Sequence, residues 1–274
     1  MKATDPWTAI VTGGAGGIGA AVTRKLASRG INVLIADLQD DEGEKLVVEL
    51  KNEYNVDAAF LHVDVSQEAD VIQMVNRAVE LWGRLDYAAN VAGICKESPK
   101  EETSLTTELF DQHFAINQRG VWLCQKYQAA QMLKQEPRKV ELVPTPLLPV
   151  RPQRGSIVNV ASTTAINGMG WPAYAPTKHA VLSITKNGAL MYGPKGIRCN
   201  SVAPGATLTP MAVANSNPDA VQEESEYTKP IALKSWSMPE EQAAVMSFLL
   251  SPESSYITGV NIPVDGGFTS TRSA

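Results

Sequence analysis

The sequence contains few cysteines and few histidines. Only three of its 274 residues are cysteines, namely Cys95, Cys124 and Cys199. Their odd number, wide spacing and lack of a Cys-x-x-Cys pair argue against a disulfide framework and against a zinc site, and favour a reducing compartment. No two of the three histidines have the spacing of metal ligands, so we expect no bound metal and assign no histidine a catalytic role.

The chain also lacks an excess of positive charge. Lys and Arg number 24 against 29 Asp and Glu, which gives a formal net charge of −5. Such a composition provides no cationic field to hold a polyphosphate backbone. We therefore expect no nucleic-acid partner.

Long apolar runs are missing as well. The first residues, MKATDPWTAIVTGG, lack the basic and apolar regions of a signal peptide, and no run of about 18 apolar residues could span a bilayer. We expect no membrane partner and a cytoplasmic location. Two charge-free runs, 155–177 and 199–218, are rich in Ser, Thr, Asn, Gly and Pro, and we interpret them as walls of a buried polar cleft.

The residues that are present favour a layered α/β protein, because 44% are apolar and short apolar runs alternate with helical patterns. Strands are expected at 7–12, 32–36, 57–62, 86–90, 155–161, 197–203 and 260–264. Helices are expected at 17–29, 40–53, 68–82, 106–135, 173–192 and 239–250. The sequence therefore predicts one doubly wound, Rossmann-like domain over 1–274, with a seven-stranded parallel sheet flanked by helices.

A glycine-rich turn, TGGAGGIG at 12–19, directly follows the first expected strand and opens the first expected helix. Glycines there permit a tight turn and let the backbone approach a pyrophosphate, which the amino end of the helix attracts. The turn predicts dinucleotide binding. The expected contacts are Gly13, Gly17, Ile18 and Gly19.

Asp37 ends the second expected strand, 18 residues past Gly19. A carboxylate at this place accepts hydrogen bonds from the adenosine ribose hydroxyls and repels a 2′-phosphate, which favours NAD over NADP. The alternative is that Asp37 is only a helix cap or loop acid.

Two further turns follow the third and fourth expected strands. Asp64 and Val65 lie at the same edge of the sheet, where a carboxylate or a neighbouring amide meets the adenine amino group; a capping role for Asp64 is the alternative. The small-residue turn NVAG leaves room for a flat ring against the backbone. Its expected contacts are Asn90, Ala92 and Gly93.

Tyr174 and Lys178 stand four residues apart on an expected helix and so share one face, and Ser162 precedes Tyr174 by twelve residues. A tyrosine with a pKa of about 10 is a poor base at neutral pH. Lowering that pKa by about three units requires roughly 4 kcal/mol, which a nearby ammonium and an oxidised nicotinamide in a partly desolvated cleft supply together. The trio therefore predicts acid–base chemistry.

The motifs described so far occur along the chain together with three others, in a fixed order. They are TGGAGGIG, Asp37, NVAG, Asn117, Ser162, the Tyr174/Lys178 pair, PGATLTPM at 204–211 and VDGG at 264–267. Together, from about residue 7 to 267, they resemble the short-chain dehydrogenase/reductase family in its small one-domain form. The interval of twelve between Ser162 and Tyr174, where thirteen is frequent, leaves open whether Thr163 shares the hydroxyl role. NVAG, where NNAG is usual, is a mild departure.

The resemblance implies a role for each catalytic candidate. Tyr174 exchanges the proton of the substrate oxygen, and Lys178 holds the nicotinamide ribose and lowers the tyrosine pKa. Ser162 hydrogen-bonds the carbonyl oxygen, and Asn117 positions a water that leads protons out past Lys178. The segment PGATLTPM resembles the part that meets the nicotinamide carboxamide. Its expected contacts are Pro204, Gly205, Thr207 and Thr209.

We therefore predict an NAD(H)-dependent oxidoreductase that interconverts a secondary alcohol and a ketone, with Tyr174 as acid and base. The alternatives are an NADPH-dependent ketone reductase, non-redox chemistry on the same fold, and a nucleotide sensor. We expect a homo-oligomer, either a dimer or a tetramer.

For two segments the prediction concerns their location in the fold and not a sequence motif. The substrate loop, 205–237, is expected to bring Met211, Tyr227 and Trp236, together with Trp171, to an apolar pocket for a hydrophobic alcohol or ketone. The alternative is that these four side chains only pack in the core. A proline-rich insertion at 136–154 joins a helix to the amino end of a strand, so we expect it on the side away from the cofactor, packed on its own body or on a neighbouring subunit.

Overall fold

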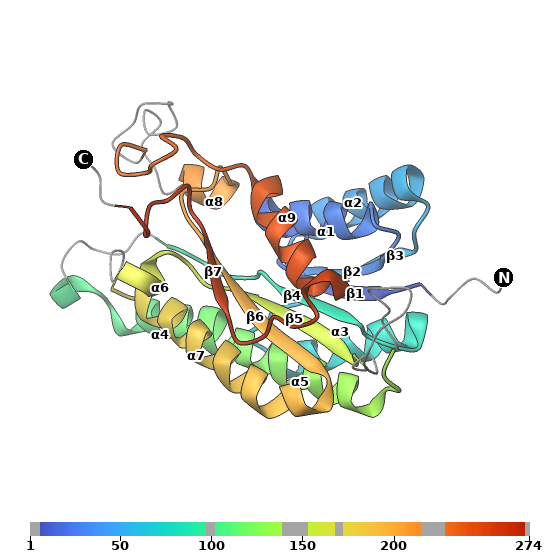
Figure 1. Cartoon of the computed structure of the whole chain (residues 1–274). Helices are drawn as coiled ribbons and strands as arrows, with labels where there is room; N and C mark the ends of the chain where they lie inside the picture. Colours follow the sequence, from blue (N-terminus) through green and yellow to red (C-terminus); the bar gives the residue numbers. More distant parts are fainter. Residues whose placement is uncertain (1–5, 97–101, 139–152, 168–171, 215–227, 272–274) are drawn as a thin grey trace.

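Seven parallel strands form one sheet at the centre of the molecule (Figure 1). The computed structural model describes residues 6–96, 102–138, 153–167, 172–214 and 228–271. The strands are β1 (Thr8–Thr12), β2 (Asn32–Asp37), β3 (Ala58–His62), β4 (Tyr87–Asn90), β5 (Gly155–Val160), β6 (Ile197–Pro204) and β7 (Asn261–Val264). All seven expected strands are present, and their ends agree to within a residue or two. The predicted doubly wound fold is confirmed.

The strand order is β3-β2-β1-β4-β5-β6-β7, so the chain changes its direction of winding after β3. As a result, β1 pairs with β2 on one side and with β4 on the other. Thr12 at the end of β1 lies opposite both Ala36 and Asn90. In open sheets of this kind the crevice beyond the carboxyl ends of such strands is where ligands bind.

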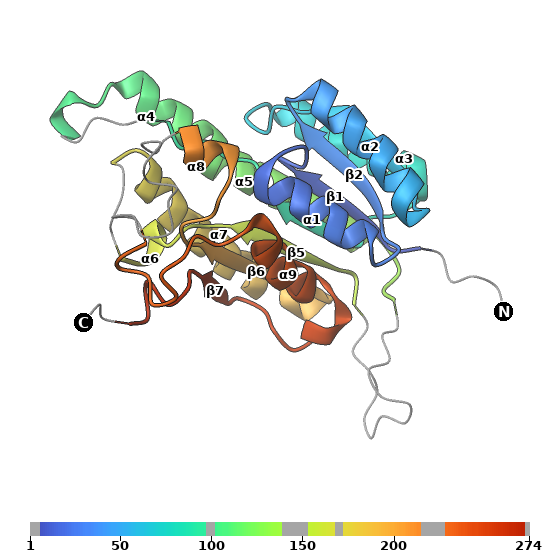
Figure 2. The same ribbon diagram turned by 90° about the horizontal axis from the view of Figure 1, so that it is seen from above.

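Helices cover both faces of the sheet (Figure 2). The face that receives Ala9 and Val11 is covered by α1 (Gly17–Ala27), α2 (Asp40–Tyr54) and α9 (Pro239–Leu250). The opposite face, which receives Ile10, is covered by α3 (Glu68–Trp82), α5 (Val121–Lys134) and α7 (Tyr174–Tyr192). Alternate residues of each strand thus enter two separate cores, which explains why the strands appear as continuous apolar runs.

The prediction of a single helix at 106–135 is wrong for the middle of this segment. The segment consists of α4 (Thr107–His113), a π-helix (Phe114–Gly120) and α5. Gly120, at the end of the π-helix, packs so closely on Val65 that a Cβ on this residue would lie 3.0 Å from the Val65 side chain. Apolar spacing does not distinguish a turn of wider pitch from an ordinary one, so the sequence pattern missed the change.

Short elements were also missed. They are α6 (Thr164–Asn167), α8 (Pro210–Ala214) and the 3₁₀ turns Glu102–Ser104, Gly193–Lys195 and Pro252–Ser254. Each has five residues or fewer, which is too little to establish a helical period.

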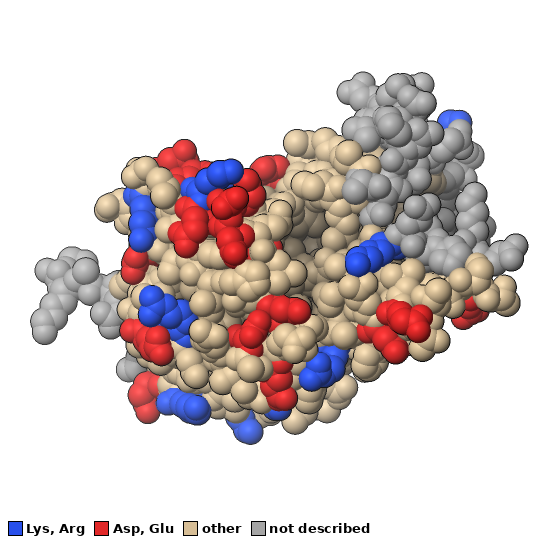
Figure 3. Space-filling model, turned by 180° about the vertical axis from the view of Figure 1, so that it is seen from behind, with Lys and Arg blue, Asp and Glu red and all other residues tan. Residues whose placement is uncertain are grey.

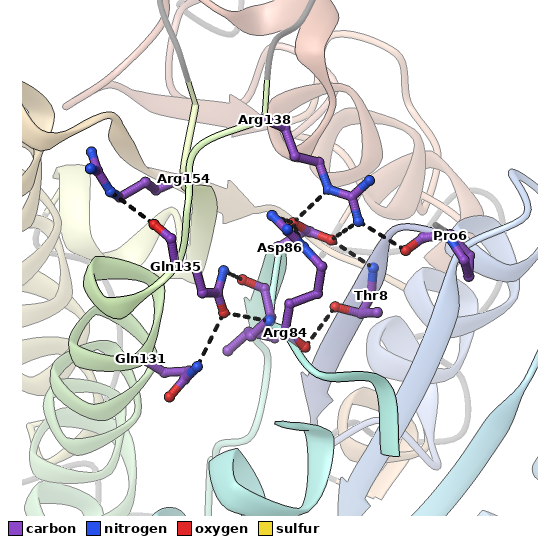
Figure 4. A network of polar contacts seen from close by, with 9 residues as sticks. Pro6, Thr8, Arg84, Asp86, Gln131, Gln135, Arg138 and Arg154 are labelled. Atoms are coloured by element: carbon purple, nitrogen blue, oxygen red, sulfur yellow. Dashed lines mark hydrogen bonds and ion pairs between the residues drawn. The ribbon is translucent and has the colours of Figure 1, made fainter. Parts of the chain in front are cut away.

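Most of the expected proline-rich insertion lies outside the described residues, but its two flanks do not. Arg138 and Gln153 form an antiparallel bridge with backbone hydrogen bonds of 2.8 and 3.0 Å. The Arg138 guanidinium also binds the buried carboxylate of Asp86, next to the amino end of β4, and the Pro6 carbonyl oxygen (Figure 4). The flanks therefore lie at the edge of the sheet opposite the carboxyl ends of the strands.

A buried arginine closes the end of α9. Arg198 on β6 donates hydrogen bonds to the carbonyl oxygens of Leu249, Leu250, Ser251 and Ile257 and to the Ser254 hydroxyl. These carbonyls include the last ones of the helix, which have no partner within the helix itself. Burial lowers the pKa of Arg198 to about 10.

On the face shown in Figure 3, Lys and Arg are interspersed with Asp and Glu. In the part of the chain that the structure describes, no helix is long and apolar enough to cross a membrane. Within the same ranges, the His, Cys, Asp and Glu side chains form no group of three suited to a metal ion. All three cysteines are free thiols.

Candidate active site

A cleft of about 580 Å³ opens at the carboxyl edge of the sheet, beside the point where the winding changes direction. Its walls come from the loops after β1, β2, β3, β4, β5 and β6 and from the first turn of α7. Both charge-free runs contribute to it, through residues 160–164, 174, 204–207 and 209–212. The expected cleft and its two polar walls are therefore present.

The glycine turn forms the floor of the cleft through Gly13, Gly17, Ile18 and Gly19. Gly13 has φ +64°, and a Cβ at this residue would lie 2.8 Å from the Cα of Ala92. A Cβ on Gly19 would overlap the carbonyl oxygen of Gly13. Because the N-cap of α1 is Gly16, no side chain occupies the first N–H groups of the helix. The turn is thus a bare backbone cradle at a helix amino end, the arrangement that suits a phosphate.

Asp37 lines the cleft and is tied to its surroundings at both carboxylate oxygens. Oδ2 accepts a hydrogen bond from Ala15 N at 2.9 Å, and Oδ1 accepts from Leu38 N at 2.7 Å and from Gln39 N at 3.2 Å. Asp37 therefore joins the end of β2 to the glycine turn. It acts as the loop acid of the alternative interpretation and is at the same time a wall of the cleft.

Asp64 and Val65 also line the cleft, and Asp64 caps its own turn by accepting from Ser66 N at 2.9 Å. Ala92 and Gly93 lie in the cleft wall after β4. Asn90 does not lie in the wall, which corrects its expected placement. Its side chain is buried inside the protein and exchanges hydrogen bonds with Gln128 and Asn159. An amide at the end of a strand can face either way, and here the sheet interior supplies its partners.

The structure brings Ser162, Tyr174 and Lys178 together on one side of the cleft. Ser162 follows β5 and hydrogen-bonds the Tyr174 side chain. Lys178, one helical turn past Tyr174, donates from Nζ to the Val160 carbonyl oxygen at 3.0 Å. Thr163 lines the same wall, next to Ser162.

Burial shifts the two titratable groups of the trio toward their neutral forms. It raises the pKa of Tyr174 well above its ordinary value, although the hydrogen bond with Ser162 acts in the opposite direction. Burial also lowers the pKa of Lys178 to about 8. In the chain's own surroundings, desolvation of Tyr174 thus outweighs the hydrogen bond with Ser162.

Asn117 lies in the middle of the π-helix and is fully buried behind the cleft wall. Its Oδ1 accepts from Ile94 N at 2.8 Å, and its Nδ2 donates to Ile94 O at 2.8 Å and to Thr177 Oγ1 at 3.3 Å. A Cβ on Gly93 would lie 3.0 Å from Asn117 Oδ1 and 3.4 Å from Lys178 Nζ. Asn117 and Lys178 therefore both lie against Gly93.

The segment after β6 forms a further part of the cleft wall and includes Pro204, Gly205, Thr207 and Thr209. The Thr207 hydroxyl donates to Gly205 O at 3.1 Å and lies 2.9 Å from Ser237 Oγ. Thr209 caps the next turn and packs over the glycine turn, where a Cβ on Gly17 would lie 3.3 Å from its methyl group. The glycine turn and the segment after β6 therefore lie close together at Gly17 and Thr209.

The expected apolar pocket is present in part. Met211 and Trp236 line the cleft, together with Ile94 and Cys95. Burial raises the pKa of the Cys95 thiol to about 11, so this thiol is neutral at neutral pH. The other two expected aromatic residues, Trp171 and Tyr227, lie outside the described residues.

Several residues around the site were not singled out by sequence reasoning. Gln39 lies beside Asp37, and Gln242 on α9 donates to Thr207, Ser237 and the Val264 carbonyl oxygen. His113 is buried with its ring edge toward Tyr174, at 6.5 Å between ring centres. None of these residues belongs to a local motif. Only Gln39 could have been identified from the sequence, because it lies two residues past Asp37.

Comparison with known proteins agrees with this geometry. Residues 13–269 match a family model described as enoyl-(acyl carrier protein) reductase. The chain is 38% identical to 2,5-dichloro-2,5-cyclohexadiene-1,4-diol dehydrogenase of Sphingobium indicum over 265 residues, with 96% of each chain covered. It is 36% identical over 275 residues to (+)-borneol dehydrogenase 2 of Salvia officinalis, which covers 97% of this chain and 90% of the other.

A solved structure extends the comparison to the fold. The crystal structure of levodione reductase matches with a TM-score of 0.86 and 32% sequence identity, over 98% of this chain and 99% of the other. These relatives are named as dehydrogenases and reductases, in agreement with the glycine turn and the Ser, Tyr and Lys side chains of the cleft. The chain therefore belongs to the short-chain dehydrogenase/reductase family of oxidoreductases.

Proposed function

We propose that the protein is an NAD(H)-dependent oxidoreductase that interconverts a secondary alcohol and a ketone, with Tyr174 as acid and base. One observation carries the proposal. Ser162, Tyr174 and Lys178 lie on a single wall of a cleft whose floor is a bare glycine turn at the amino end of α1. Proton-transfer groups and a phosphate cradle thus share one space.

The residues of the cleft fit a nicotinamide dinucleotide. The glycine turn would hold the pyrophosphate, because a Cβ at Gly13 or Gly19 would collide with backbone there. Asp37 would accept from the ribose hydroxyls, and Lys178 would hold the nicotinamide ribose. When bound, the dinucleotide supplies the group that takes or gives the hydride.

Tyr174 and Ser162 act on the substrate oxygen. Both hydroxyls line the cleft, and Ser162 is hydrogen-bonded to Tyr174. When a carbonyl oxygen replaces this mutual hydrogen bond, each hydroxyl can donate its proton to that oxygen. A raised pKa keeps Tyr174 protonated, which prepares it to donate its proton to the oxygen as a ketone is reduced. In the reverse direction Tyr174 accepts the hydroxyl proton, and the Lys178 ammonium stabilises the resulting phenolate.

Charge favours NAD over NADP. Asp37 lines the cleft and is 9% exposed. The first turn of α2, which follows it in the chain, adds Asp40, Asp41 and Glu42. A 2′-phosphate would bring negative charge against this acidic edge.

The substrate is proposed to be a hydrophobic alcohol or ketone. Ile94, Met211 and Trp236 form apolar parts of the wall of the cleft that Tyr174 also lines. Relatives named for a cyclohexadiene diol, for borneol and for levodione are consistent with this class. We further propose a cytoplasmic homo-oligomer, either a dimer or a tetramer.

A steady-state assay tests the proposal. The purified protein is supplied with a panel of cyclic and linear secondary alcohols and NAD⁺ or NADP⁺, and with the corresponding ketones and NADH or NADPH. We expect turnover with NAD(H) and a cyclic, apolar substrate. Turnover only with NADP(H) would assign the protein to the NADPH-dependent reductases. Coenzyme binding without redox turnover of any substrate would favour non-redox chemistry or nucleotide sensing.

A further inference from the structure

Thr177 lies on α7 between the two residues proposed to handle the proton, Tyr174 and Lys178. It is 1% exposed, so its hydroxyl group has no access to bulk water. Oγ1 donates to the Tyr174 carbonyl oxygen at 2.7 Å, one turn back along the helix. This hydrogen bond uses the only proton that the hydroxyl group has.

Because its proton is committed, Thr177 Oγ1 acts toward Asn117 only as an acceptor. Asn117 Nδ2 donates to it at 3.3 Å and donates its second proton to Ile94 O at 2.8 Å. Asn117 Oδ1 then faces Ile94 N at 2.8 Å. The amide has one orientation that satisfies all of these partners, and Thr177 helps to fix it.

This orientation determines what Lys178 meets across Gly93. Asn117 Oδ1 and Lys178 Nζ both lie close to the place that a Gly93 Cβ would occupy, at 3.0 and 3.4 Å. An acceptor oxygen on this side favours the charged ammonium. If the amide turned over, a second donor would take its place and would disfavour the charge.

Resting on the proposed function, we propose that Thr177 is a positioning residue, which holds the Asn117 amide so that its oxygen faces the Lys178 side of Gly93. Thr177 is not among the residues that line the cleft. It acts through Asn117 and through the peptide of Ile94 in the cleft wall. The other titratable groups around this site are Tyr174, Cys95 and, behind the tyrosine ring, His113.

The test compares Thr177→Val, Thr177→Ser and a matched control, Thr185→Val. Thr185 is also 1% exposed on α7, donates to the carbonyl oxygen one turn back and accepts from an asparagine amide, that of Asn159. It lies two turns away from the site. The control therefore removes the same chemical group from the same helix without touching Asn117.

We expect Thr177→Val to lower kcat about tenfold with little change in the KM for the coenzyme, and to move the alkaline limb of the pH profile to lower pH. Thr177→Ser should restore both, and Thr185→Val should lose stability without a shift of the limb. The proposal would be overturned if both valine variants lost activity to the same extent and the loss matched their decrease in Tm. An unchanged kcat and limb in Thr177→Val would also overturn it.

A second measurement is independent of activity. Exchange with solvent of the Asn117 side-chain amide protons, assigned through Asn117→Ala, should be slow in the parent protein and in Thr185→Val and fast in Thr177→Val. Unchanged exchange in Thr177→Val overturns the positioning role. If no substrate is turned over, the proposed function fails while this measurement still decides the role of Thr177.

Discussion

Lys178 lies against Tyr174 with its ammonium nitrogen 5.4 Å from the centre of the tyrosine ring. Burial acts on both side chains, raising the pKa of Tyr174 and lowering that of Lys178 to about 8. The surroundings therefore favour two neutral groups, whereas the proposed chemistry uses a charged lysine. Residues held against their preferred charge in this way are typical of functional sites.

The first prediction concerns Lys178→Met, which should inactivate the protein and stabilise it. At pH 7 Lys178 is mostly charged in a dry place, and its lowered pKa corresponds to about 3 kcal/mol of unfavourable free energy. The lost hydrogen bond to Val160 offsets about 1 kcal/mol of this. We expect Tm to rise by roughly 5 °C at pH 7.

The pH dependence of that gain has a definite sign. Between about pH 8 and the ordinary lysine pKa, the unfolded parent chain binds more protons than the folded one, so the parent's stability rises with pH. The advantage of Lys178→Met should therefore shrink across this window. Thermal unfolding at pH 7 and pH 9.5 measures it, and a variant less stable than the parent at pH 7 would contradict the prediction.

The second prediction is that Tyr174→Phe removes the acid and base while the fold and coenzyme binding remain. Only one hydroxyl group is lost, and its loss leaves the Ser162 hydroxyl in place. Turnover should fall about 10²-fold or more, the usual size of an acid–base contribution. Turnover within a few-fold of the parent would rule out the mechanism, and loss of coenzyme binding would indicate a structural role.

The third prediction separates the two roles of Asp37. Asp37→Asn keeps an acceptor oxygen for the backbone of Leu38 and Gln39 but removes the charge and the acceptor for Ala15 N, whereas Asp37→Ala removes all of them. Both variants should weaken NAD use and narrow its advantage over NADP, measured as the ratio of kcat/KM values. Asp37→Ala should lower Tm more than Asp37→Asn does. A parent enzyme that prefers NADPH, or an unchanged ratio, would refute the assignment.

The fourth prediction concerns Arg198. Arg198→Met would leave the last carbonyls of α9 buried without their donor, and we expect a loss of about 3 kcal/mol in the free energy of unfolding. Arg24→Met is the matched control, because Arg24 forms a half-exposed ion pair with Glu49 that is worth less than about 1 kcal/mol. Urea unfolding of both variants checks the contrast, and equal losses would contradict it.

The fifth prediction concerns the insertion. Replacing 139–152 by a brief Gly/Ser turn should leave the KM for NAD nearly unchanged, because the flanks lie at the edge of the sheet away from the cleft. Stability or oligomer size should change instead. A selective loss of substrate affinity, with Tm and mass unaffected, would show that the segment reaches the active site.

The sheet and its order of elements were readable from the sequence because each strand is an apolar run followed by a turn with its own chemistry. Asp37 and the glycine turn are the clearest case, since both end neighbouring strands of a parallel sheet. Tyr174 and Lys178 were placed correctly by the helical period alone. Such features are local, and a single segment of chain specifies them.

What was missed depends on contacts between distant segments. Asn90 turns inward to Gln128 and Asn159, and Gly120 at the end of the π-helix packs closely on Val65. The shift in the tyrosine pKa depends on how deeply the cleft is buried. Thr177 lay inside a recognised motif, yet its link to Asn117 spans 60 residues of sequence.

The bridge between Arg138 and Gln153 has a consequence for engineering. Because Arg138 is bridged to Gln153 and bound by Asp86, the segment that joins these two residues begins and ends at nearly the same place. A replaced segment should therefore perturb the strands only weakly. The entropy cost of closing a longer loop grows only slowly with its length. The site is a natural port for a reporter or a second domain, placed across the sheet from the catalytic chemistry.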